Sequence, residues 1–234
     1  IDTLCSELVR IAFDAARSRG EFHIALSGGS TPEPLYRRLV IDPRYRFLPW
    51  EMAHVWLVDE RCVPPDDSDS NYRMIRESLL DHVEIPSDQV HPMPVLQRGG
   101  QLAYEKEMKQ ALGPEGRLDF VLLGMGADGH TASLFPSTEA LHEDQRWVLF
   151  NGGPTVAPPR PRMTLTFPAI NAARVVTVLV LGENKFPTLQ RVSLSPHDLE
   201  RLPITGVAPA PDDSELMWYI DGPAAVGPTA AAPE

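Results

Sequence analysis

The chain has 234 residues, 43% of them hydrophobic, and a formal net charge of −11; these values suit one large or two small globular domains and exclude a wholly disordered chain. The acidic balance argues against a general binder of nucleic acid or of membrane surfaces, while leaving room for a local basic pocket. Two cysteines are too few for a disulfide framework and no run of about 18 apolar residues predicts a membrane-spanning helix, so we expect a cytoplasmic protein.

Hydrophobic periodicity predicts strands that alternate with helices along most of the chain. In chain order, the expected elements are a helix over 2–19, a strand over 22–26, a helix over 32–40, a strand over 53–58, helices over 72–82 and 102–112, strands over 119–123, 147–150, 163–167 and 175–181, a helix over 183–192 and a strand over 216–220. This alternation favours a single α/β domain over residues 1–221, with a largely parallel sheet covered by helices on both faces. We expect residues 222–234 to form a disordered tail, and the proline-rich stretch 154–161 to be a surface loop or a lid.

The loop SGGSTP at 27–32 connects the first strand to the next helix. Gly28 and Gly29 allow backbone N–H groups to point at a ligand, the helix N-terminus adds partial positive charge, and the hydroxyls of Ser27, Ser30 and Thr31 add donors. This suits a phosphate monoester, although a tight turn in which Thr31 caps the helix explains the same residues equally well. The loop is neither a Walker loop nor a G-x-G-x-x-G fingerprint.

Two cations, Arg162 and Lys185, lie at the ends of predicted strands. Each alone is more often a solvated surface charge, but together they favour the phosphate interpretation if the fold brings them to the glycine loop. Arg162 opens its strand rather than ending it, so the fold would have to bring it round to the same edge of the sheet.

Asp59 and Arg61 follow a predicted strand, at the edge where open α/β sheets bind ligands, and we expect both to serve function. The side chains at 67, 69 and 71 have the spacing of the first calcium ligands of an EF-hand, but the required glycine and the final glutamate are missing, which excludes that site. Cys62 could be a reactive thiolate, although a lone cysteine is more often a small buried residue.

The segment GMGADGHTASLFP at 124–136 follows the buried strand 119–123 and is the most informative stretch of the chain. His130 is suited to act as a general base that takes a proton from water, and Asp128 could orient the site. The chain has no G-x-S-x-G, no H-E-x-x-H and no zinc spacing among its other histidines. These absences leave metal-free acid–base chemistry on a phosphorylated small molecule. A lone histidine is more often structural than catalytic, but the glycine-dense loop around His130 favours a functional role.

Four segments together resemble the 6-phosphogluconolactonase family, across almost the whole chain. They are SGGSTP at 27–32, VDER at 58–61 with SNY at 70–72, GMGADGHTASLFP at 124–136, and RMTLTFPAIN at 162–171 with LVLGENK at 179–185. The resemblance implies a Rossmann-like α/β fold, usually cytosolic, without metal or organic cofactor. It also implies hydrolysis of the sugar-phosphate lactone 6-phosphogluconolactone to 6-phosphogluconate in the pentose phosphate pathway; we expect a monomer or small homo-oligomer.

Carried over to this chain, the resemblance assigns His130 as the general base that activates water, with Asp128 among the catalytic residues. Asp59 and Arg61 match the family's polar pair near the lactone, where Arg61 could steady the developing oxyanion. The residues that match the phosphate loop, the phosphate cations, the histidine loop and the further lining of the site are Ser27, Gly28, Gly29, Ser30, Thr31, Arg162, Lys185, Gly129 and Asn71. One departure from the family is Phe186-Pro187 after Lys185, which crowds the start of the following helix.

Two other functions remain open. An amino-sugar-phosphate isomerase/deaminase shares the fold, but such enzymes tend to have an aromatic residue where this chain has Arg61, and an acidic residue before the position of Pro136. A non-catalytic sugar-phosphate sensor would keep the phosphate loop and would not need His130, but no helix-turn-helix or basic region accompanies the loop.

Overall fold

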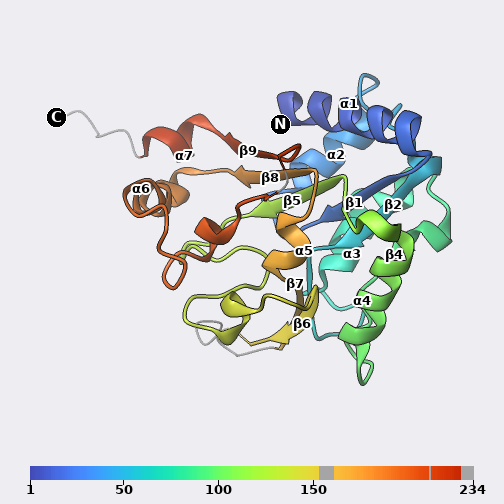
Figure 1. The fold of residues 1–234 in the computed structure, drawn as a ribbon. Helices are drawn as coiled ribbons and strands as arrows, with labels where there is room; N and C mark the ends of the chain where they lie inside the picture. The colour runs from blue at the N-terminus through green and yellow to red at the C-terminus, as the bar shows by residue number, and fades with distance from the viewer. Residues whose placement is uncertain (153–160, 211, 228–234) are drawn as a thin grey trace.

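A six-stranded sheet forms the centre of the computed structural model, which describes residues 1–152, 161–210 and 212–227 (Figure 1). Its strand order is β4-β2-β1-β5-β8-β9, and all five pairings are parallel. The strands are β1 Phe22–Leu26, β2 Ala53–Leu57, β4 Val90–His91, β5 Phe120–Gly124, β8 Val175–Val180 and β9 Glu215–Ile220. Every residue of β8 is buried, as expected for a parallel strand covered on both faces. The predicted fold class is confirmed.

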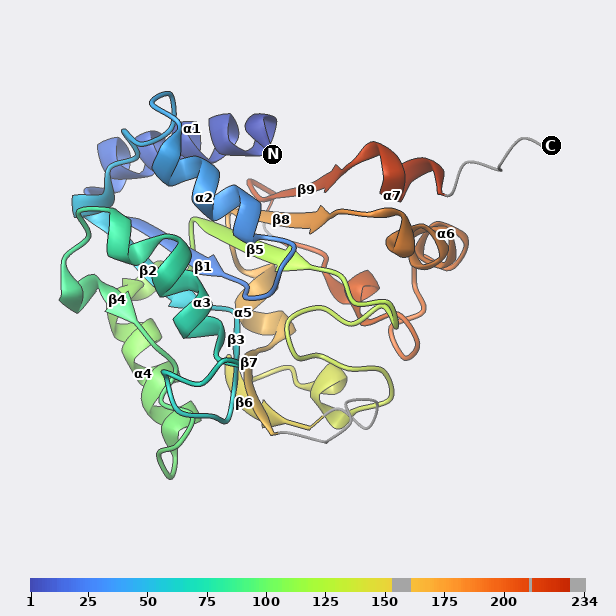
Figure 2. The ribbon, with the colours of Figure 1, turned by 180° about the vertical axis from the view of Figure 1, so that it is seen from behind.

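Helices cover both faces of this sheet. They are α1 Asp2–Arg19, α2 Glu33–Ile41, α3 Asn71–Ser78, α4 Gly100–Ala111, α5 Phe167–Asn171, α6 Phe186–Leu194 and α7 Gly222–Val226, with short 3-10 helices at Trp50–Met52, Leu80–His82, Ser87–Gln89, Gly113–Glu115, Glu139–His142, Glu183–Lys185 and Pro203–Gly206. Figures 1 and 2 show α1 and α2 on one side of the sheet and α4 and α5 on the other. The side chains that α1 buries recur every three or four positions, so its apolar stripe packs against the core.

A second, antiparallel sheet extends the fold beyond the C-terminal edge of the first. It consists of β3 Asp59–Arg61, β7 Arg162–Leu165 and β6 Val148–Asn151, in the order β3-β7-β6. Only one residue separates β2 from β3, so β3 starts where the parallel sheet ends. The sequence analysis predicts no strand over 59–61, because three residues are too few for a periodic pattern to reveal one. The register pairs Arg61 with Arg162, which brings Arg162 round to the ligand edge.

Other differences from the sequence predictions are local. The helix after the glycine loop begins at Glu33, with Pro32 at the N-cap and no side-chain capping bond, so Thr31 is not its cap. The expected strand over 163–167 ends at Leu165. The structure folds Gly222–Val226 into α7, capped by the side chain of Asp221, where the sequence suggested a disordered tail; residues 228–234 and most of the candidate lid lie outside the described residues. No helix in the described part is long and apolar enough to cross a membrane.

Candidate active site

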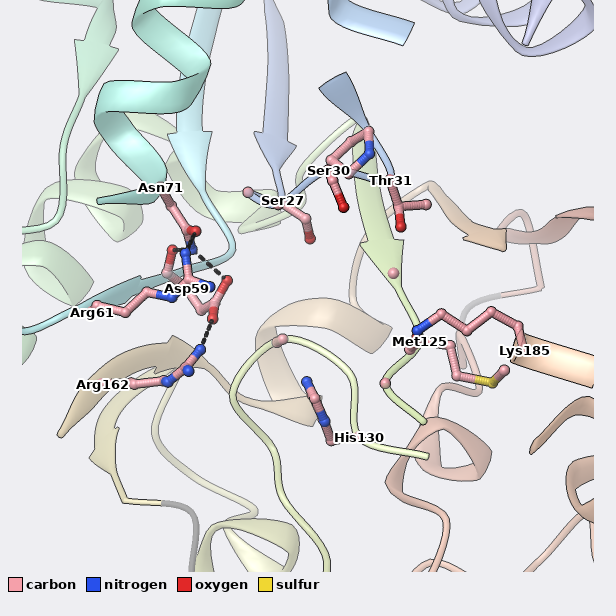
Figure 3. Close-up of a pocket in the computed structure, with 16 residues that line it drawn as sticks. Ser27, Ser30, Thr31, Asp59, Arg61, Asn71, Met125, His130, Arg162 and Lys185 are labelled. Atoms are coloured by element: carbon pink, nitrogen blue, oxygen red, sulfur yellow. Dashed lines mark hydrogen bonds and ion pairs between the residues drawn. The ribbon is translucent and has the colours of Figure 1, made fainter. Parts of the chain in front are cut away.

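A pocket opens at the C-terminal edge of the parallel sheet, where the loops after β1 and β5 meet the short strands β3 and β7 (Figure 3). It is lined by Ser27, Gly28, Gly29, Ser30, Thr31, Pro32, Asp59, Arg61, Asn71, Gly124, Met125, Gly126, His130, Ala132, Arg162 and Lys185. The lining thus unites almost all residues that the sequence singled out; Asp128 and Gly129 lie outside it. Its volume of about 240 Å³ suits a small metabolite, since pockets for drug-sized ligands measure about 300–1,000 Å³.

His130 and Asp128 form a hydrogen-bonded pair at this pocket. His130 Nδ1 lies 2.6 Å from Asp128 Oδ1, and the same oxygen accepts from the His130 backbone N–H at 3.1 Å. Burial acts to raise the pKa of Asp128, but the hydrogen bonds and charge of His130 outweigh it and lower that pKa to about 2. The carboxylate therefore stays ionised and accepts the proton of Nδ1, which leaves the lone pair on Nε2. This tautomer is the one that a general base needs.

The glycine at 126 is required by the close approach of this pair. A Cβ there would lie 2.2 Å from His130 Nδ1 and 2.6 Å from Asp128 Oδ1. Phe135, buried beneath the loop, packs its ring 4.8 Å from the His130 ring and 5.5 Å from the Arg162 guanidinium carbon. Gly126 and Phe135 belong to the motif at 124–136, but their roles depend on contacts that spacing does not reveal.

Asp59 organises the opposite side of the pocket. Its Oδ2 accepts from Ser133 Oγ at 2.5 Å, and its Oδ1 accepts from Asn71 Nδ2 at 3.0 Å. Arg162 Nη1 lies 3.9 Å from Oδ2, while Arg61 Nη1 donates to Asn71 Oδ1. Both oxygens of Asp59 are thus engaged, so this buried carboxylate connects Ser133 to Asn71. Ser133 is the partner that the sequence analysis missed.

The two predicted phosphate cations enter the pocket from different sides. Lys185 Nζ donates to the Met125 carbonyl at 2.8 Å, whereas Arg162 lies beside Asp59, with His130 between the two sides (Figure 3). Burial lowers the pKa of both cations. Arg162 Nε is buried and has no hydrogen-bond partner among the described residues.

The structure also bears on the reactivity of Cys62. Burial, together with the charge of Glu60, raises the pKa of Cys62, which contradicts a low-pKa thiolate.

Among the described residues, Glu21, His23 and His54 form the one group that could hold a metal ion, at the other end of the parallel strands. Trp56 Nε1 donates to His23 Nδ1 at 3.1 Å, so the proton of neutral His23 sits on Nε2, the atom that would have to bind the metal.

Comparison with known proteins gives consistent matches over most of the chain. The family model described as glucosamine-6-phosphate isomerases/6-phosphogluconolactonase matches residues 1–218. The chain is 42% identical to the GDH/6PGL endoplasmic bifunctional protein of Homo sapiens, covering 97% of this chain but only 29% of that relative's length. It is 40% identical to a 6-phosphogluconolactonase of Nostoc sp., covering 93% of this chain and 90% of the relative. The structure of a 6-phosphogluconolactonase from Thermotoga maritima has a TM-score of 0.78 at 29% identity, covering 94% of each chain.

Proposed function

The chain belongs to the family of glucosamine-6-phosphate isomerases and 6-phosphogluconolactonases, and from this premise we propose that it hydrolyses 6-phosphogluconolactone to 6-phosphogluconate in the pentose phosphate pathway. We assign the reaction to one domain over residues 1–221, acting in the cytoplasm without a metal ion. The donor set supports a metal-free reaction: among the described residues that line the pocket, Asp59 is the one carboxylate, and both of its oxygens accept hydrogen bonds.

The observation that carries the proposal is the 2.6 Å contact between His130 Nδ1 and Asp128 Oδ1 at the edge of the pocket. In the first step, His130 Nε2 takes a proton from water while the water oxygen attacks the lactone carbonyl carbon. The tetrahedral intermediate then breaks the bond between that carbon and the ring oxygen, and the imidazolium returns the proton to the ring oxygen. Asp128 stabilises the imidazolium between the two steps and keeps Nδ1 as the donor.

The cations of the pocket would bind different parts of the substrate, the phosphate at one end and the lactone at the other. Lys185, with the glycine loop and its hydroxyls, would bind the phosphate before the chemistry begins. Arg61 and Arg162, which are held at Asp59 and Asn71, would face the lactone and stabilise the negative charge that develops on its carbonyl oxygen. This assignment moves Arg162 from the phosphate to the lactone, because it lies across the pocket from Lys185. The local cations also explain how an acidic protein could attract an anionic substrate.

The direct test is hydrolysis of freshly prepared 6-phosphogluconolactone, followed through a 6-phosphogluconate dehydrogenase couple, with spontaneous hydrolysis subtracted. We expect acceleration that is equal with and without EDTA. Loss of the acceleration in EDTA would contradict the metal-free mechanism, and no acceleration at all would contradict the function. Release of ammonia from glucosamine 6-phosphate in a parallel assay would instead identify an isomerase/deaminase.

A further inference from the structure

Glu60 is a buried carboxylate that lies directly behind the pocket, between Asp59 and Arg61. Its side chain is only 3% exposed and accepts four hydrogen bonds. Oε1 accepts from the backbone N–H groups of Arg61 at 2.7 Å and Asn71 at 2.8 Å. Oε2 accepts from the Tyr72 N–H at 2.8 Å and from the hydroxyl of Ser70 at 2.9 Å. The pocket does not contact this side chain, and the lactonase mechanism above does not use it.

These four bonds tie the strand β3 to the first turn of α3. The Asn71 and Tyr72 N–H groups are the first two of the helix and have no acceptor within it, and a carboxylate at this end also interacts favourably with the helix dipole. Burial raises the pKa of Glu60, against the lowering effect of its hydrogen bonds. The carboxylate thus fixes where α3 begins relative to β3.

Asn71 is the first residue of α3, so the position of the helix start determines where the Asn71 side chain lies in the pocket. Its Nδ2 donates to the backbone oxygen and to Oδ1 of Asp59, and its Oδ1 accepts from Arg61. The fit is tight, since a Cβ on Gly28 would lie 2.0 Å from Asn71 Oδ1. We infer that Glu60 is a positioning residue for the reaction: its carboxylate places Asn71, which in turn aligns Asp59 and Arg61 on the lactone side. The inference rests on the proposed function for its kinetic consequence.

Replacing Glu60 by glutamine would keep the size of the side chain but disrupt its four hydrogen bonds. Its oxygen can accept two of the four bonds, while its NH₂ must face either two backbone donors or one backbone donor and the Ser70 hydroxyl. The hydroxyl can turn its proton away, but the Tyr72 N–H cannot, so two donors would meet. The start of α3 must then move, and a displacement of about 1 Å at a catalytic site costs about 100-fold in rate.

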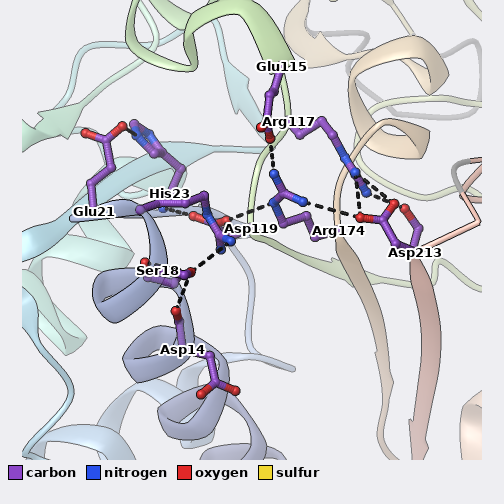
Figure 4. Close-up of polar contacts among 12 residues, drawn as sticks. Asp14, Ser18, Glu21, His23, Glu115, Arg117, Asp119, Arg174 and Asp213 are labelled. Carbon is purple, nitrogen blue, oxygen red and sulfur yellow. Dashed lines mark hydrogen bonds and ion pairs between the residues drawn. The ribbon is translucent and has the colours of Figure 1, made fainter.

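Asp119 provides a matched control at the other end of the parallel strands (Figure 4). It is also a buried carboxylate, 2% exposed, and it accepts from the His23 N–H at 2.7 Å and from Arg19 Nη2 at 2.5 Å. It precedes β5, whose far end, Gly124, lines the pocket. The change Asp119→Asn is therefore the same chemical change as Glu60→Gln at a similarly buried carboxylate, without a link to Asn71.

The experiment is a double-mutant cycle on kcat/KM for 6-phosphogluconolactone, with urea unfolding of each variant to establish that it is folded. We expect Glu60→Gln to lower kcat/KM by about 10- to 100-fold, mainly through kcat, and Asp119→Asn to change it by no more than about twofold. In an Asn71→Ala background, Glu60→Gln should add less than about twofold, because its route to the pocket is already removed. A Glu60→Gln enzyme as active as wild type, or an undiminished effect in the Asn71→Ala background, would overturn the inference.

Two additions keep the inference testable. If Glu60→Gln fails to fold, Ser70→Ala removes one of the four donors, together with the hydroxyl that accepts from the Arg73 N–H at the start of α3. Its smaller loss of kcat/KM must likewise vanish in the Asn71→Ala background. If wild type hydrolyses no lactone, the proposed function fails, and the side-chain amide NMR signal of Asn71 then decides the role of Glu60. That signal should shift in Glu60→Gln and not in Asp119→Asn; an unchanged signal in Glu60→Gln would refute the positioning role.

Discussion

Replacing Gly126 by alanine should disable the histidine–aspartate pair without touching either residue. The added Cβ would lie 2.2 Å from His130 Nδ1 and 2.3 Å from Cε1, whereas real Cβ contacts essentially never fall below 3.0 Å, so the ring must retreat by about 0.8 Å. The same methyl group would lie 2.6 Å from Asp128 Oδ1, so the carboxylate cannot follow unhindered. The imidazole would lose both its place in the pocket and its hydrogen-bond partner.

The expected effect is on the chemical step. A misplacement of about 1 Å costs about 100-fold in rate, so we expect kcat to fall by about two orders of magnitude while KM, which reflects phosphate binding, changes little. The coupled dehydrogenase assay measures both constants across a range of lactone concentrations. Urea unfolding of the variant shows whether the protein is folded at the assay temperature.

Gly124→Ala is the control for a methyl group added to the same pocket. A Cβ there meets no protein atom within 4 Å, so it leaves His130 and Asp128 in place, and any crowding of the substrate should appear in KM. Equal kcat values for the Gly126→Ala and Gly124→Ala enzymes would refute the argument that the geometry of the histidine–aspartate pair limits the reaction.

The remaining predictions concern the base, the cations and stability. His130→Asn should lower kcat by about two to four orders of magnitude with little change in KM, and unchanged turnover would remove this residue from the mechanism. Lys185→Ala should mainly raise KM, and Arg162→Ala should mainly lower kcat. The opposite result would mean that Arg162 binds the phosphate and Lys185 faces the lactone. Burial lowers the pKa of His54 to about 4, below the value of about 6.5 in an unfolded chain. The stability that this group contributes is therefore present above pH 6.5 and lost as the pH falls toward 4. In urea unfolding, the loss of stability between about pH 7.5 and pH 5 should be about 2 kcal/mol smaller in a His54→Gln variant than in wild type. An equal loss in both proteins would contradict the assignment.

The parallel sheet could be predicted from sequence because each of its main strands is a short apolar run with a helical pattern nearby. Phe22–Leu26 has the predicted bounds, and Val175–Val180 differs from them by one residue. The antiparallel sheet could not be predicted in this way. Its central pairing joins Asp59–Arg61 to a strand about a hundred residues later, and no local pattern records which distant segment a three-residue strand will meet.

The two sides of the candidate site differ in the same way, since one depends on a local motif and the other on contacts between distant segments. The bond between Asp128 and His130 spans two residues of one loop, so a local motif can carry it, together with the glycine that makes room for it. The lactone side depends on tertiary contacts: Ser133 reaches Asp59 across 74 positions, and Arg162 reaches it through the register of two short strands. A motif can therefore indicate the candidate base, but only the fold shows which residues hold the cations opposite it. Substitutions on that side, at Glu60 or Ser133, are accordingly the ones whose effects sequence reasoning would not anticipate.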